Sequence, residues 1–98
     1  MNDDQIARKK AVLDILPSLN YRIIKDDGQY IKAESVHKWD SVNNRPISCQ
    51  GKRHLQMNFD IDKTYVGIKE DAETRTVFSG WINVAEDLIF INEKTLIM

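Results

Sequence analysis

The side chains that could bind a metal ion or act as a nucleophile are few and lie in the central third of the chain. His37, Cys49 and His54 are its only imidazole and thiol groups, and they lack the spacing of two to five residues that pairs the ligands of structural zinc sites. A lone cysteine forms neither an intramolecular disulfide nor a thiolate cage. We therefore expect no metal site, no Cys–His nucleophile and no bound cofactor.

Two carboxylates offer a second kind of chemistry. Asp60 and Asp62 would project from the same face of one strand, an arrangement that metal-dependent nucleases use to share a cation. Such a nuclease also needs a further carboxylate and a lysine at a recognisable offset, which do not follow here, and the four glycines are too dispersed for a phosphate-binding loop. A small metal-dependent hydrolase that uses Asp60, Asp62 and His54 is our third hypothesis, and we expect no enzyme.

The segment 37–54 has the composition of a binding loop. It carries four basic side chains against the single acid Asp40, together with one of the two tryptophans. Tryptophan and arginine dominate protein-binding hot spots, and arginine with an aromatic ring also recognises phosphates. A connection longer than ~12–15 residues in a compact domain usually carries function. We predict a partner-binding surface formed by Trp39, Arg45, Lys52 and Arg53.

Acidic side chains gather in the predicted turns, including Asp26-Asp27 and Glu86-Asp87. In a meander, alternate turns share one end of the sheet, so several of them would merge into an acidic edge that meets a basic partner such as a toxin or a nuclease. Turns favour aspartate for local reasons as well. The predicted contact residues in this second surface are Glu70, Asp71 and Glu73.

These residues need a scaffold, and its clearest element is the run His54–Ile61. Leu55, Met57, Phe59 and Ile61 alternate with polar residues, which is the period of a strand with one dry and one wet face. We interpret this run as a central strand of an antiparallel sheet.

Other elements follow from local signals. Asn2 and Gln5 predict a capping box for a helix that begins near Asp3 and ends around Leu16 to Leu19. Asp27-Gly28 predicts a hairpin turn between two strands. Further strands are expected at 47–50, 64–69, 75–84, 88–91 and 95–98, and Gly80 indicates a bulge or a closely packed neighbour.

The predicted fold is α+β, with an N-terminal helix packed on a curved antiparallel meander of five to seven strands. The 98 residues suit one domain, 1–98, with 14 basic and 15 acidic side chains in near balance. The N-terminus lacks the apolar core of a secretory signal, and apolar runs stay far below the ~20 residues that span a bilayer. We expect a cytoplasmic protein that does not contact a membrane.

The expected function is that of a small non-enzymatic binding protein that masks a macromolecular partner, in the manner of an immunity protein, an antitoxin or a phage-encoded inhibitor. We expect a protein partner. The alternative is a nucleic-acid-binding module that uses the basic loop 37–54. Tyr21, Tyr30 and Trp81 lie in predicted strands, where they serve either as core residues or as platforms on which bases stack.

Overall fold

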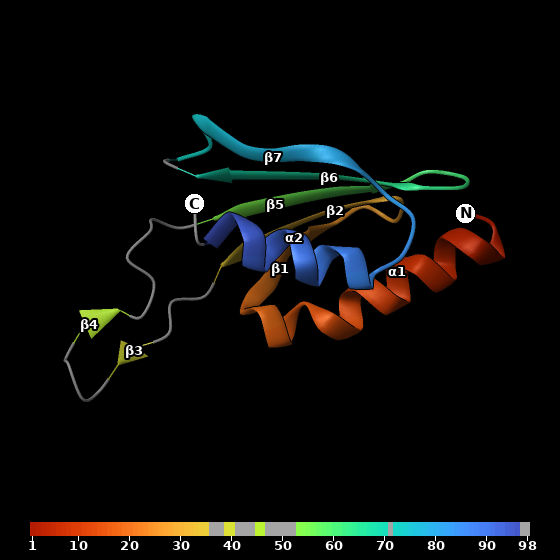
Figure 1. The fold of residues 1–98 in the computed structure, drawn as a ribbon. Coiled ribbons are helices and arrows are strands. Elements are labelled where there is room, and N and C mark those ends of the chain that lie inside the picture. The colour runs from red at the N-terminus through yellow and green to blue at the C-terminus, as the bar shows by residue number, and fades with distance from the viewer. Residues whose placement is uncertain (36–38, 41–44, 47–52, 71, 97–98) are drawn as a thin grey trace.

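A computed structural model describes residues 1–35, 39–40, 45–46, 53–70 and 72–96. The elements follow one another along the chain as α1 (Asp3–Ile15), a 3-10 turn η1 (Pro17–Leu19), β1 (Tyr21–Asp26), β2 (Tyr30–Ser35), β3 (Trp39–Asp40), β4 (Arg45–Pro46), β5 (His54–Phe59), β6 (Thr64–Glu70), β7 (Arg75–Ile82) and α2 (Glu86–Leu96) (Figure 1). Five strands form an antiparallel sheet in the order β1-β2-β5-β6-β7, and β3 pairs with β4 alone. The predicted α+β fold with an N-terminal helix and an antiparallel meander is confirmed.

Helix α1 begins where the sequence predicts. Asn2 Oδ1 accepts a hydrogen bond of 2.8 Å from the backbone N–H of Gln5, and Gln5 Oε1 accepts one of 2.8 Å from the backbone N–H of Asn2. The Gln5 side-chain amide also donates to the carbonyl oxygen of Phe59 at 2.8 Å, which joins the cap to the central strand. Asn20 turns the chain into β1 with a left-handed φ of 66°.

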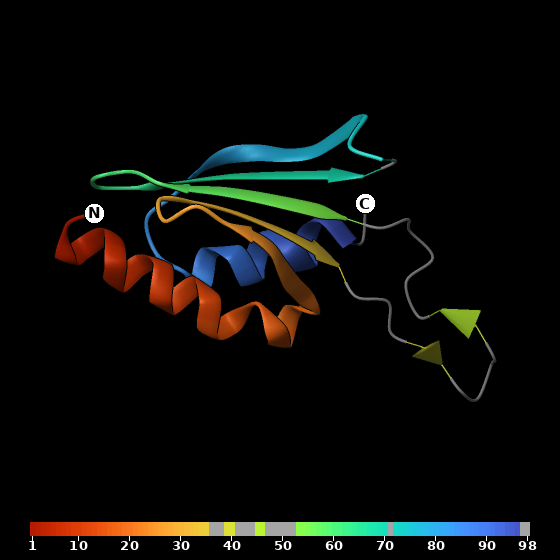
Figure 2. The same ribbon diagram turned by 180° about the vertical axis from the view of Figure 1, so that it is seen from behind.

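Two connections of the meander, whose strands Figure 2 shows from behind, are fixed by their backbone. Gly28 has φ +78° in the predicted Asp27-Gly28 turn. The two ends of the segment 36–52 are held together, because the backbone N–H of Ser35 donates to Arg53 O at 2.9 Å and the backbone N–H of Arg53 donates to Ser35 Oγ at 2.8 Å.

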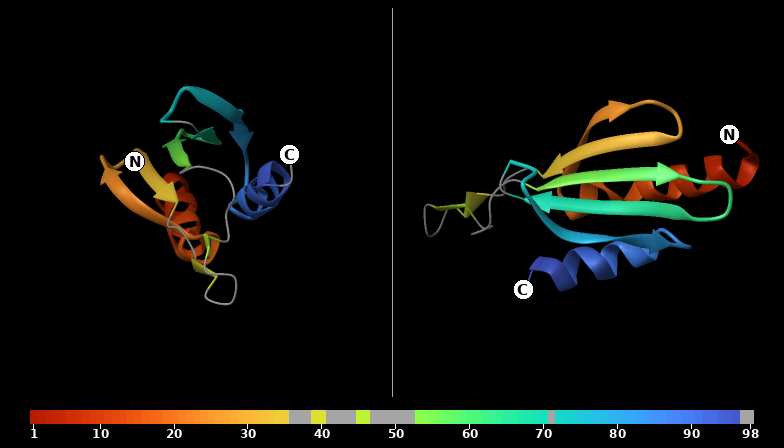
Figure 3. Two further views of the ribbon diagram at one scale, coloured as in Figure 1. Left: turned by 90° about the vertical axis from the view of Figure 1, so that its left-hand side faces the viewer. Right: turned by 90° about the horizontal axis from the view of Figure 1, so that it is seen from above.

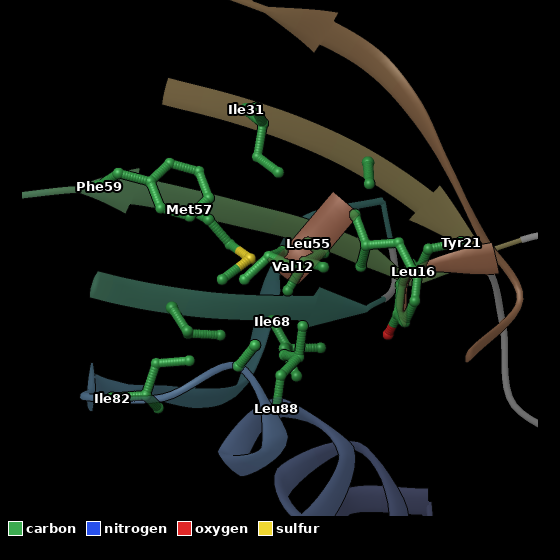
Figure 4. Close-up of a cluster of buried hydrophobic side chains, with 13 residues drawn as sticks. Val12, Leu16, Tyr21, Ile31, Leu55, Met57, Phe59, Ile68, Ile82 and Leu88 are labelled. Carbon is green, nitrogen blue, oxygen red and sulfur yellow. The ribbon is translucent and has the colours of Figure 1, made fainter. Parts of the chain in front are cut away.

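Strand β5 supplies the centre of the core (Figure 4). Leu55, Met57 and Phe59 are 0 % exposed, which confirms the predicted register of the central strand. The strand is shorter than predicted, however. It ends at Phe59, so Ile61 lies in the following turn and is 68 % exposed instead of facing the core.

Residues Glu86–Leu96 form helix α2, so the strand predicted at 88–91 is wrong. The strand predicted at 95–98 is also wrong for its first two residues, and 97–98 lie outside the described residues. Isoleucine and phenylalanine at 89–91 favour a strand locally. Burial follows a helical spacing instead, and packing on the sheet outweighs that local preference. The buried residues are Ala85, Leu88, Asn92 and Thr95.

Both helices lie on the same side of the curved sheet, as the end-on view in Figure 3 shows. Val12 of α1, Leu16 directly after that helix and Leu88 of α2 enter one core with the inward side chains of the strands. Among the described residues, no helix or strand covers the opposite face of the sheet.

Candidate binding surface

The uncovered face of the sheet, called the open face below, is the candidate functional site. Cross-strand register places its side chains in rows across the sheet. Aromatic rings, amides and basic groups predominate, and these bind by stacking and hydrogen bonding. The rows are Tyr30, Asn58, Tyr65 and Trp81; Lys25, Lys32, Gln56, Gly67 and Ser79; and Arg22, Glu34, His54, Lys69 and Thr76.

Trp81 is an exposed aromatic ring held in a fixed position. It is 52 % exposed, and the edge of the Tyr65 ring meets it with centroids 5.5 Å apart and planes at 73°. Lys63 Nζ lies 4.5 Å from the centroid of the Trp81 ring, a cation–π contact. The Tyr65 hydroxyl is itself fixed by a 2.6 Å hydrogen bond with Ser79 Oγ. Trp81 is thus a pre-ordered anchor, which a partner can contact with little loss of side-chain entropy.

Two glycines lie beside aromatic rings on the two faces of this strand pair. A Cβ on Gly67 would lie 3.5 Å from the Tyr65 ring, an ordinary van der Waals contact. On the core face, a Cβ on Gly80 would lie 3.1 Å from the Phe78 ring, which confirms the closely packed neighbour predicted there. The bulge of β7 falls at Val77, where the register with β6 shifts.

The open face carries more basic than acidic side chains. Arg22 bonds to Glu34, and Lys25 Nζ lies 3.3 Å from Asp27 Oδ2. Lys63 and Lys69 form no ion pair with any described residue. Among the cross-strand rows and the turn residue Glu73, which contacts Lys32, four basic groups minus two acidic ones gives a net charge of +2. The basic groups are Arg22, Lys25, Lys32 and Lys69, and the acidic ones are Glu34 and Glu73.

The turn between β6 and β7 reaches over the open face. Glu73 Oε1 lies 2.6 Å from Lys32 Nζ on β2 and accepts a weaker hydrogen bond of 3.4 Å from Gln56 Nε2. The hydrogen bond from Lys32 to Glu73 lowers the pKa of the Glu73 carboxyl and raises the pKa of the Lys32 ammonium. Ala72 and Glu73 have φ of 57° and 69°, a region that costs energy for residues other than glycine. The contact with Lys32 therefore holds a strained turn in place.

The residues predicted to bind a partner are distributed over different parts of the chain. Trp39 lies in β3 opposite Pro46, and Arg45 lies in β4 opposite Asp40. Lys52 and Asp71 lie outside the described residues, as do His37, Cys49 and the predicted strand 47–50. Glu73 lies on the open face. The partner-binding roles of these residues stay predictions.

Arg53 and Glu70, predicted for two separate surfaces, instead bind each other in the interior. Their side chains are 4 % and 2 % exposed, and Arg53 Nε donates to Glu70 Oε1 at 3.0 Å. Arg53 also donates to Thr95 Oγ1 at 2.7 Å and to the Thr95 carbonyl at 2.9 Å, and Arg75 reaches Glu70 Oε2 at 3.0 Å. The pair fixes the C-terminal turn of α2 against the sheet.

The three tyrosine and tryptophan residues considered as stacking platforms have different surroundings. Tyr21 is buried, its hydroxyl donates to Asn92 Oδ1 at 3.1 Å, and burial raises the pKa of that hydroxyl. Tyr30 is half-buried on the open face. Trp81 alone of the three is exposed and remains the candidate platform.

The two aspartates of the hydrolase hypothesis lie in the turn after β5 instead of on a strand. Asp60 Oδ1 accepts a hydrogen bond of 2.9 Å from the backbone N–H of Ile61, so this carboxylate stabilises its own turn. Arg8 donates to the carbonyl oxygens of Asp60 and Ile61, which joins the turn to α1. Within the described part of the chain, no group of three or more metal-binding side chains is assembled.

Sequence reasoning did not single out Tyr65, Lys63 or Lys69 for the site. A signal existed, because the strand 64–69 alternates and its outward positions are Tyr65, Gly67 and Lys69. What could not be known was the pairing that places Tyr65 opposite Trp81.

Comparison with known proteins gives no family. No family model matches this chain, and no match was found among curated proteins or solved structures. In the described part of the chain, neither helix has the length and apolar character needed to cross a membrane.

Proposed function

We propose that this chain is a small non-enzymatic binding protein that masks a partner protein, in the manner of an immunity protein, an antitoxin or a phage-encoded inhibitor, and that the open face is its contact surface. The observation that carries the proposal is Trp81, half exposed on an uncovered sheet face and held by Tyr65 and Lys63. Ordered tryptophans surrounded by polar groups are typical anchors of protein interfaces.

The net positive charge of the open face favours a partner with an acidic surface. Lys63 and Lys69, which have no ion pair among the described residues, are available to acidic groups of that partner. The segment 37–54, with Trp39, Arg45 and Lys52, supplies a second set of contacts under the same proposal.

A nucleic-acid-binding module is the second candidate, and it has a specific observation in its favour. An exposed Trp81 ring beside Lys63 provides the stacking and phosphate contacts that single-stranded nucleic acid uses. Lys69 adds a further positive charge on the same face. The near balance of charge over the whole chain gives this candidate no long-range attraction to nucleic acid.

The test compares two variants with a matched control. Tagged wild-type protein, Trp81→Ala, Lys69→Glu and the control Ile6→Ala, whose side chain is 51 % exposed on α1, are used to capture partners from lysate with and without nuclease treatment. We expect one nuclease-insensitive protein, retained by Ile6→Ala and lost or weakened at least ~10-fold by Trp81→Ala.

Salt dependence separates the two candidates. With three or four phosphate contacts, the logarithm of the association constant falls with the logarithm of the salt concentration with a slope of about −2 to −4. Tight, salt-steep binding to an oligonucleotide that Trp81→Ala abolishes would contradict the protein-masking proposal and place the nucleic-acid module first.

A further inference from the structure

A groove runs beside the last strand of the sheet, between β7 and α2. Its volume is about 200 Å³, and Phe90 at its border is 65 % exposed. An aromatic ring left in water beside an apolar groove is typical of a contact site. The groove is lined by Val77 and Phe78 from the strand and by Phe90, Ile91, Lys94 and Thr95 from the helix.

Helix α2 extends past the lateral edge of the sheet that β7 forms. Seen from above, it lies largely outside the β7 edge, as the right-hand view in Figure 3 shows. The described sheet ends at β7, so one side of this strand presents backbone N–H and C=O groups without a strand partner. A sixth strand placed against β7 would lie over α2, where it would cover Phe90 and the groove.

The side chains at this edge indicate what kind of strand it accepts. No charged residue occurs from 76 to 84, so the edge lacks the charges that usually prevent strand addition. Basic groups lie at one end only. Lys94 borders the groove, and Arg75 begins β7 two residues before Val77. An acidic residue on the added strand would be stabilised at that end.

We propose that the β7 edge and α2 bind an extended segment of a partner protein, which adds to the sheet as a sixth, antiparallel strand. Its backbone bonds to β7, and its alternate apolar side chains enter the groove beside Phe90 and Ile91. An acidic residue at its C-terminal end lies by Lys94. This site is separate from the open face and does not depend on the function proposed there.

A second copy of the chain fits the edge less well. Pairing of two β7 strands about a twofold axis would bring both α2 helices beneath the same pair of strands, because each helix extends past its own sheet. A single extended segment brings no helix of its own and meets no such obstacle.

The test uses a seven-residue acetylated and amidated peptide, added to the full chain. Valine occupies positions 1, 3 and 5, threonine positions 2, 4 and 6 and glutamate position 7, so the glutamate lies on the same side as the valines. We expect slower amide hydrogen exchange along β7 and a dissociation constant raised at least tenfold by Phe90→Asp. The matched control Ile6→Asp, on α1 and also about half exposed, should bind as wild type does. Lys94→Glu should reverse the preference, so that a peptide ending in lysine binds better. Thermal melts confirm that each variant is folded.

Two N-methylated peptides test the strand addition itself. Methyl groups on the valine nitrogens and on the threonine nitrogens block opposite edges of the peptide, so a peptide that pairs with β7 tolerates only one of them. Equal binding of both, or no binding of the parent peptide at millimolar concentration, would overturn the proposal. So would self-association of the wild-type protein that Phe90→Asp abolishes, since this would give the site to a second copy.

Discussion

The guanidinium of Arg53 and the carboxylate of Glu70 form an ion pair in the interior, although both residues belong to charge types that normally face water. They are separated by 17 positions along the chain and lie at the same end of the sheet, where Arg53 also holds Thr95 of α2. The pair thus connects three parts of the fold: the end of β6, the start of β5, which Arg53 directly precedes, and the last turn of α2.

Loss of one partner should be more harmful than loss of both. Glu70→Met takes the Glu70 carboxylate away from the buried guanidinium of Arg53 and should lower the free energy of unfolding by about 3–5 kcal/mol. Arg53→Met leaves Glu70 with the exposed Arg75 as its counter-ion and should also lower it, whereas the double variant Arg53→Met/Glu70→Met should lose much less than the sum of the two single losses. Urea denaturation measures each value. Arg75→Ala is the control, because Arg75 is 59 % exposed and its bond to Glu70 should contribute no more than about 1 kcal/mol. Additive single losses would contradict the pairing.

The register of β5 predicts opposite effects of aspartate at neighbouring positions. Met57→Asp places a charge in the core and should prevent folding, whereas Asn58→Asp on the exposed side should change stability by less than ~0.5 kcal/mol. Circular-dichroism melts distinguish the two. A stable Met57→Asp protein would show that the strand faces the other way.

The strained turn after β6 should be improved by glycine. Ala72→Gly removes the Cβ from a residue at φ 57° and should raise the free energy of unfolding by about 0.5–1 kcal/mol. The same substitution at Ala11, an exposed position within α1, should lower it by about 0.5–1 kcal/mol. Chemical denaturation of both variants checks the sign, and a loss at both positions would show that the turn is not strained.

Acid should weaken the bonds of Glu73 and Asp26. Hydrogen bonds from Lys32 to Glu73 and from Lys9 to Asp26 lower the pKa of each carboxyl below its usual value. Their contribution is therefore present above the ordinary pKa values of 4.5 and 3.8 and is lost as the pH falls through the lower folded values.

Melting temperatures between pH 7 and pH 2.5 test this dependence. Glu73→Gln and Asp26→Asn should each make the fall in melting temperature less steep, and Lys32→Met should resemble Glu73→Gln because it removes the same pair. At the alkaline end, the contribution of Lys32 is present below its ordinary pKa of 10.5 and is lost as the pH rises through its raised folded value. An unchanged acid slope in all three variants would exclude these bonds as its cause.

The purified protein should not cleave nucleic acid. Asp60 stabilises its own turn, and the described residues assemble no group of three metal-binding side chains. Incubation of DNA and RNA with the protein and magnesium, manganese or zinc should leave both intact. Cleavage that disappears in Asp60→Asn and Asp62→Asn would place the hydrolase hypothesis first.

Local signals were sufficient for three features of the fold. The capping box of Asn2 and Gln5, the Asp27-Gly28 turn and the alternation around Met57 each report on contacts within a few residues, so the sequence alone specifies them. The C-terminal helix was missed because a short apolar run is compatible with a strand as well as with a helix. Only the packing of this run beside β7 selects the helix.

The site was less predictable, for a related reason. Charged residues are expected at the surface by default, so nothing local distinguishes the buried Arg53 from the half-buried Lys63, or the buried Glu70 from Glu73. Trp81 was recognised as a stacking candidate. Its support by Tyr65 and Lys63 arises from the β6–β7 register and the preceding turn, which no spacing in the sequence reveals.

The two hydrogen bonds between Ser35 and Arg53 make the segment 36–52 a replaceable insertion. They close the domain at the point where the chain leaves β2 and returns toward β5, two strands that are already neighbours. Doubling the length of a connection between fixed ends costs only about 0.6 kcal/mol. Natural variation can therefore lengthen, shorten or rewrite these residues while the sheet and both helices keep their structure.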